Sequence, residues 1–218
     1  MATFFGNAIN RGKGVAQKTQ LKAEILLLER TIRSRKKVFG VELYNDLNEI
    51  TCQQDFYATT DQTIATLRPS LLSTDREIRA LSNKKLIIKG ELDLIQARRA
   101  EAFPAPAANW KEKAANAAQG TGMAANEAKI RTEMKVVETQ MYGLKEEFGL
   151  TVFPVLEQLF GTSSGPIGIH SSTDEVVNKI RSTYQTCKAD IIVINRKILS
   201  KQALIEQVDV NVSIRNLS

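Results

Sequence analysis

Apolar residues recur along most of this chain at alternating spacings of three and four, which is the pattern of long amphipathic helices. The first row begins after residue 15 and predicts a helix that continues toward Leu67, before Pro69. The spacing becomes four and four around Gly40, a phase slip that resembles a stutter in a coiled coil. The row comprises Leu21, Ile25, Leu28, Ile32, Phe39, Leu43, Leu47 and Ile50.

Three further rows predict three further helices. The second helix is expected to begin at the capping box of residues 74–77 (Thr-Asp-Arg-Glu) and to end before Pro104. The third should span about residues 125–160, with Pro154 bending or interrupting it. The fourth is expected to begin at a second capping box, residues 172–175 (Ser-Thr-Asp-Glu), and it has the most regular heptads of the chain.

The four helices fall into two copies of one unit. Residues 22–47 align without a gap with residues 131–156, and residues 73–95 align with residues 172–194. Because caps, apolar register and individual residues agree, we interpret the chain as a duplicated helical pair. In the first alignment, Glu24, Glu29, Lys36, Phe39, Gly40 and Leu47 match Glu133, Glu138, Lys145, Phe148, Gly149 and Leu156.

The fold class expected from these patterns is all-α, with four long helices in an elongated bundle or coiled coil. Residues 16–103 and 125–208 should each form an antiparallel helical hairpin, joined by an Ala/Pro/Gly-rich linker at residues 104–124. Residues 1–15 are expected to be a flexible or amphipathic N-terminal segment. The tail at residues 209–218 is expected to be extended or disordered.

The Phe-Gly pairs Phe39-Gly40 and Phe148-Gly149 lie where the heptad phase slips in each copy. A glycine at that point would let a neighbouring helix approach closely, and the phenylalanine would fill the layer beside it. Aromatic residues at helical spacing usually belong to the core, so a structural role is favoured. A ligand pocket beside the two glycines is the alternative.

Charge adds a second set of candidate residues. The net charge is +6, most of it in residues 1–103, which allows an anionic partner without requiring one. On the first helix Arg30, Arg33 and Lys37 share one face, where they either contact phosphate or are simply solvated. The N-terminal segment could insert into an anionic membrane or dock on the core, and its candidate contacts are Phe4, Phe5, Ile9, Arg11 and Lys13.

Chemistry that would indicate an enzyme is not apparent. Two cysteines and one histidine cannot supply the four ligands of a structural zinc, and no cofactor or metal is expected. The glycine-containing loop at residues 161–168 lacks the Gly-Lys-Ser/Thr ending of a phosphate-binding loop. His170 follows that loop without a Ser or Cys partner in any recognisable motif. No catalytic residue is therefore predicted.

The function expected from these observations is a non-enzymatic helical scaffold or accessory subunit that binds protein, either another copy or a larger assembly. The alternative is a peripheral membrane-binding protein, because the long basic helices resemble BAR-domain and ESCRT-III proteins in architecture, without a diagnostic motif of either family. Nucleic-acid binding ranks third. With few cysteines and no signal-peptide core at the N-terminus, an intracellular and cytoplasmic location is expected, with an organelle interior as the alternative.

Overall fold

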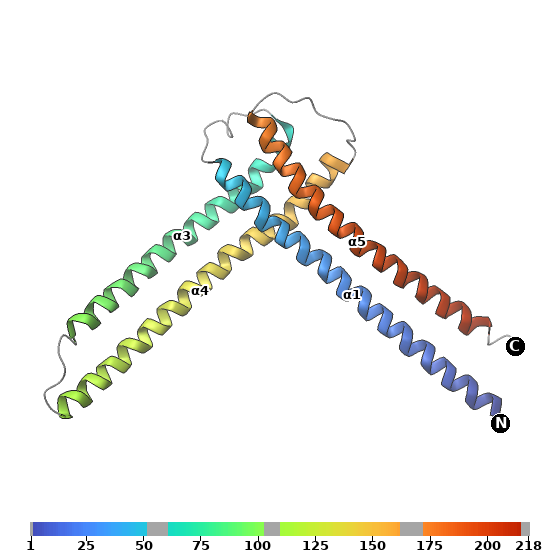
Figure 1. Ribbon diagram of the computed structural model, residues 1–218, viewed down its shortest axis with the longest axis horizontal. Coiled ribbons are helices and arrows are strands. Elements are labelled where there is room, and N and C mark those ends of the chain that lie inside the picture. Colours follow the sequence, from blue (N-terminus) through green and yellow to red (C-terminus); the bar gives the residue numbers. More distant parts are fainter. Residues whose placement is uncertain (1, 52–60, 103–109, 162–171, 215–218) are drawn as a thin grey trace.

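The computed structural model consists of four long α-helices and describes residues 2–51, 61–102, 110–161 and 172–214 (Figure 1). No strand occurs within these four segments, so the all-α fold class is confirmed. Side chains are described for residues 14–48, 61–101, 120–161 and 175–210. The helices are α1 (Ala2–Thr51), α3 (Gln62–Ala102), α4 (Trp110–Gly161) and α5 (Ser172–Ile214).

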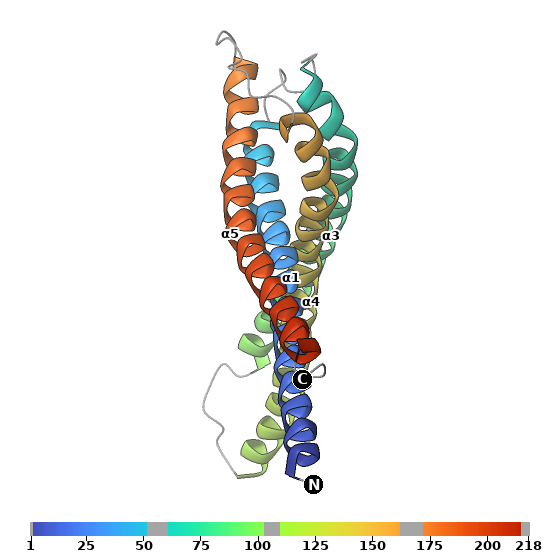
Figure 2. The same cartoon turned by 90° about the vertical axis from the view of Figure 1, so that its right-hand side faces the viewer.

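The helices are arranged as a V with two arms (Figure 1). Helices α1 and α5 run antiparallel along one arm, and α3 and α4 run antiparallel along the other. The arms join where α1 crosses α4, so that α1 and α4 lie in the middle of the head with α5 and α3 on their outer sides (Figure 2). The start of α1 and the end of α5 both lie at the far end of the α1/α5 arm.

The expected hairpins are not confirmed, because each helix packs along a helix of the other copy. The extensive contacts join α3 to α4, α1 to α5, and α1 to α4. Helices α1 and α3 diverge into different arms and meet near the head, where the Tyr44 hydroxyl donates to Asp75 Oδ1 at 3.2 Å. The physical reason is the duplication itself: α5 repeats the apolar row of α3, so either helix offers α1 a matching apolar row.

The start of α3 differs from the sequence-based expectation. The side chain of Asp61 caps this helix, since its Oδ1 accepts hydrogen bonds from the amides of Thr63 at 2.8 Å and Ile64 at 3.2 Å. The helix then continues through Pro69, and the proposed capping box at residues 74–77 lies in its interior. The box was wrong as a helix start because a better cap and three buried apolar residues precede it: Ile64, Leu67 and Leu71.

The other helix boundaries extend beyond those expected. Helix α4 already begins at Trp110, inside the predicted linker, because the alanine-rich sequence that follows favours helix. It also continues through Pro154 without interruption and ends at Gly161. Helix α5 begins at Ser172 as predicted. It reaches Ile214, so residues 209–214 are helical rather than extended, and residues 2–15 are helical as part of α1.

The main hydrophobic core lies in the head, where all four helices contribute, and it thins out along the arms. Ion pairs cross both arms, such as Lys201 with Glu24 between α5 and α1, and Lys85 with Glu138 between α3 and α4. In the α3/α4 arm a small separate cluster forms around Ile88, Ile130 and Val137. The largest fully buried side chains of the head are Phe39, Leu43, Leu47, Ile64, Leu67, Val152, Phe153, Leu156, Ile180 and Tyr184.

Candidate functional site

The crossing of α1 and α4 is built on two glycines. Gly40 and Gly149 face each other so closely that a Cβ built on either one would lie within 3.0 Å of backbone atoms of the opposite helix. For Gly40 those atoms include the Lys145 carbonyl oxygen, and for Gly149 they include the Lys36 carbonyl oxygen. Each glycine therefore meets its own duplicate, and the close approach predicted from the sequence is present.

Aromatic residues surround the crossing in two equivalent pairs. Phe39 and Phe148 are 0% and 2% exposed. The Phe39 ring packs edge-on against Phe153, with centroids 5.6 Å apart, and Phe148 packs edge-on against Tyr44 at 6.1 Å. The two contacts are equivalent, because Phe39 aligns with Phe148 and Tyr44 aligns with Phe153. Edge-to-face geometry of this kind adds to the free energy of burial.

Charged residues cover this aromatic layer, again in matched positions. The Lys36 amine lies 4.4 Å from the centroid of the Phe153 ring, and the Lys145 amine lies 5.0 Å from that of Tyr44. Burial lowers the pKa of Lys145. Across the crossing itself, Lys37 Nζ and Glu146 Oε2 form an ion pair at 2.8 Å. The crossing is thus filled by side chains and backbone, which supports a structural role for the Phe-Gly pairs.

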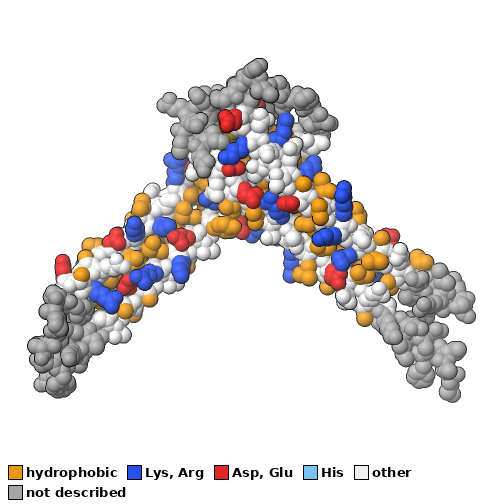
Figure 3. Space-filling view, viewed as in Figure 1, with side chains coloured by type: hydrophobic (Ala, Val, Ile, Leu, Met, Phe, Trp, Pro, Cys, Tyr) orange, Lys and Arg blue, Asp and Glu red, His pale blue; other side chains and the backbone are white. Residues whose placement is uncertain are grey.

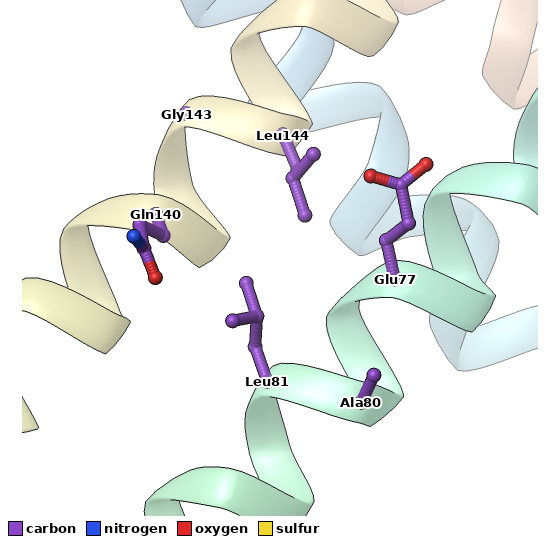
Figure 4. Close-up of a pocket in the computed structure, with 6 residues that line it drawn as sticks. All are labelled: Glu77, Ala80, Leu81, Gln140, Gly143 and Leu144. Atoms are coloured by element: carbon purple, nitrogen blue, oxygen red, sulfur yellow. The ribbon is translucent and has the colours of Figure 1, made fainter.

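A groove of about 530 Å³ lies beside the crossing, between α3 and α4 (Figure 4). Leu81 and Leu144 point toward each other from the two helices and form its floor. The groove is open because Ala80 and Gly143 are small, and a Cβ added at Gly143 would meet nothing within 4 Å. Its lining is completed by Glu77 and Gln140.

A second groove, between α1 and α5, is polar. Arg35 takes the place that Leu144 has in the second copy, and its guanidinium donates to Asp190 at 2.7 Å and to Glu42 at 3.1 Å. Burial alone would lower the pKa of Arg35, but these two hydrogen bonds raise it. A groove of about 440 Å³ between α1 and α5 is lined by Arg35, Glu42, Asn45, Asp46, Ser182, Thr183 and Thr186. The two arms therefore offer different surfaces.

The basic residues singled out on α1 do not form one site. Arg30 and Arg33 are exposed, and neither forms an ion pair within the described residues. Lys37 lies at the crossing and is engaged by Glu146. The N-terminal candidates lie in α1, but their side chains are outside the described part: Phe4, Phe5, Ile9, Arg11 and Lys13. His170 is also outside the described residues.

Groups that could carry chemistry are few. The Cys187 thiol is fully buried in the head, and burial raises its pKa to about 11, so it is protonated at neutral pH. Among the described residues no group of three or more His, Cys, Asp or Glu side chains is placed to hold a metal ion. None of the described helices contains an apolar stretch long enough to cross a membrane.

The surface feature that the sequence reading missed is a set of large aliphatic residues on the outside of the arms. On the α3/α4 arm, Ile87 is 66% exposed, Leu94 is 60% exposed and Val136 is 51% exposed. Hydrophobic side chains are visible along both arms (Figure 3). The signal was present in the sequence, because Leu86-Ile87 and Leu26-Leu27 are apolar pairs, and the contact between two paired helices cannot bury both members of such a pair.

The exposed residues are repeated by the duplication. Val136 aligns with Leu27, and Leu94 aligns with Val193, and all four are more than half exposed. Large apolar residues scattered singly are normal on a protein surface. Here two positions are apolar and exposed in both arms, one occupied by Leu27 and Val136 and the other by Leu94 and Val193.

Comparisons of this chain with models of known protein families, with curated proteins and with solved structures find no match.

Proposed function

We propose that the protein is a non-enzymatic helical scaffold or accessory subunit that holds protein partners at a fixed distance and angle in a larger assembly. The observation that carries this proposal is the duplicated exposed aliphatic residues on two arms that project from one rigid crossing. Exposed aliphatic residues on a helical arm can be buried by the apolar face of an amphipathic partner helix. A close-packed glycine crossing keeps the arms from moving independently.

The α3/α4 arm is the docking arm for partners in this proposal. Ile87, Val136 and Leu94 lie on the same side of the arm as the groove beside the crossing, because Ala80, Ile87 and Leu94 recur every seven residues on α3. On α4, Val136 and Gly143 have the same spacing. This second apolar row would accept an amphipathic helix with heptad-spaced apolar residues, which would convert the arm into a three-helix coiled coil.

A single substitution tests this docking arm. Ile87→Glu should abolish specific capture of partner proteins from a native extract by the tagged full-length chain, because a carboxylate would have to be buried in the contact. Quantitative mass spectrometry of the captured proteins measures the effect. The control is Gln185→Glu, which adds the same charge at an exposed position of α5 in the head and should capture the same partners as the wild type.

This capture experiment shows whether Ile87 belongs to a surface that binds partner proteins. An identical set of captured proteins for the wild type and Ile87→Glu would contradict the docking arm. The melting temperatures of both variants should match that of the wild type, since both positions are exposed.

Binding to an anionic membrane surface is the second candidate function, favoured by the exposed Arg30 and Arg33 on α1. Such cations attract anionic headgroups at about 1 kcal/mol each. Pelleting of the full chain with vesicles that contain phosphatidylserine, lost in the double variant Arg30→Glu, Arg33→Glu, would favour this function. Nucleic acid is the third partner class, and salt-sensitive retention on DNA or RNA would favour it.

A further inference from the structure

One face of the α1/α5 arm contrasts with the rest of the surface, because it carries almost no unpaired charge. On α1, a row at helical spacing begins with Glu24 and continues through four exposed residues without charge: Leu27, Thr31, Ser34 and Val38. On α5 the corresponding row includes Val193, Ser200 and Leu204. We refer to these seven residues together as the uncharged face.

The ion pairs between α1 and α5 place both rows on one side of the arm. Glu24 begins the α1 row and pairs with Lys201, and Asp190 begins the α5 row and pairs with Arg35. Glu24 directly precedes Ile25, and Asp190 directly precedes Ile191. Both isoleucines belong to the apolar rows along which α1 and α5 pack. In an antiparallel helix pair, positions of this type from the two helices lie on the same face.

The distribution of charge sets this face apart. The charges of Glu24 and Asp190 are neutralised by their ion pairs with the opposite helix. Lys197 is then the remaining charge among the described residues of the two rows. The opposite face of the same arm carries Lys22, Glu29, Arg33, Arg181 and Glu206. The equivalent face of the α3/α4 arm carries Lys84, Glu91, Arg98, Glu133 and Glu147. The absence of charge is therefore a property of one face and not of the helices in general.

We propose that a second copy of this chain covers the uncharged face, so that two α1/α5 arms form a four-helix bundle. The net charge of +6 makes two copies repel each other, and this face is where they can meet with the least repulsion. Depletion of charge at the centre of a contact is also a mark of homodimer interfaces. An anionic partner, attracted by the positive charge of the chain, would instead bind to the charged faces.

The dimensions of the face suit a dimer. The rows span residues 24–38 and 190–207, about 25 Å of helix at 1.5 Å per residue, and two helices side by side are about 20 Å wide. The resulting area is roughly 500 Å² per copy and about 1,000 Å² in total, which reaches the lower limit for a specific interface.

The side chains of the face alternate in size, which lets two such faces interdigitate. On α1 the large residues Leu27 and Val38 flank the small residues Thr31 and Ser34. On α5 the small Ser200 separates Val193 from Leu204. In an isologous pair, large residues of one copy fill the spaces over small residues of the other.

Sedimentation equilibrium of the full chain over about 1–100 μM tests the proposal. The wild type should sediment as a dimer, and Val193→Glu should weaken dimerisation by about tenfold or more. The matched control is Leu94→Glu, the equivalent position of the other arm, which should dimerise like the wild type. Circular dichroism confirms that both variants remain folded, since both side chains are exposed.

A wild-type monomer at every concentration would overturn the proposal, and so would equal weakening by Val193→Glu and Leu94→Glu. This inference rests on the proposed scaffold function but uses the other arm. Partner capture that depends on Ile87 with a monomeric wild type would contradict only the dimer. A dimer with capture unaffected by Ile87→Glu would contradict only the docking arm.

Discussion

Truncation of Phe39 or Phe148 to alanine should lower the free energy of unfolding by about 3–5 kcal/mol. Both rings are almost completely buried beside the glycine crossing, and each packs edge-on against an aromatic residue of the other helix. Because the two contacts are equivalent by duplication, the two variants should be destabilised by similar amounts. Urea titration followed by circular dichroism measures the change.

The control for these truncations is Tyr142→Ala, because Tyr142 is an exposed aromatic residue on α4. Its loss should change stability by about 0.5 kcal/mol or less. If Phe39→Ala and Phe148→Ala were no more destabilising than Tyr142→Ala, the aromatic layer would not be the core of the crossing.

Gly40→Ala should destabilise the protein by about 1–3 kcal/mol, although alanine normally favours a helix. The added Cβ would lie within 3.0 Å of the Gly149 backbone, and backbone atoms of two packed helices cannot give way as a flexible side chain can. The helices would have to separate, which would loosen the aromatic pairs on either side. Thermal melting and urea titration both measure the loss.

Gly90→Ala should have the opposite effect on the stability of the protein. Gly90 lies within α3, and a Cβ at that position would meet nothing within 4 Å. Alanine should therefore stabilise the protein by about 0.5–1 kcal/mol through its helix propensity. Stabilisation by Gly40→Ala as well would show that the two helices do not touch at the glycines.

The sequence predicted the crossing better than any other part of the molecule. Phe39-Gly40 and Phe148-Gly149 were recognisable because duplication retained them while the surrounding residues changed. A glycine next to a buried aromatic residue, at a slip of heptad phase, has a direct physical meaning, namely close approach of another helix. The structure shows that this other helix contains the second copy of the same motif.

The pairing of the helices could not be predicted in the same way. An apolar row predicts which face of a helix is buried, but it does not predict which other helix buries it. The rows of α3 and α5 are copies of each other, so both fit α1. Covering α1 with α3 would give a closed hairpin, and covering it with α5 gives the observed V. The choice depends on contacts between distant residues, such as the ion pair of Lys18 with Asp209 at 2.6 Å, which no local pattern reveals.

The candidate surfaces were only partly visible in the sequence. The charge run on α1 drew attention to Arg30, Arg33 and Lys37, but Lys37 pairs with Glu146 across the crossing. The uncharged face could not be recognised from α1 alone, because it requires a second row from α5. A surface made by two helices becomes visible only when the partner of each helix is known.

Helix α1 pairs with α5 and not with α3, which is the partner expected from the sequence. Cysteines at Glu24 and Lys201, whose side chains form an ion pair between these helices, test it directly in a Cys52→Ser background. Mild oxidation should form a disulfide within one chain, seen as a faster monomer band on a non-reducing gel. The contrary result is no link for that pair together with efficient linking of Glu24→Cys to Ala102→Cys, since Ala102 aligns with Lys201 and lies in the other arm.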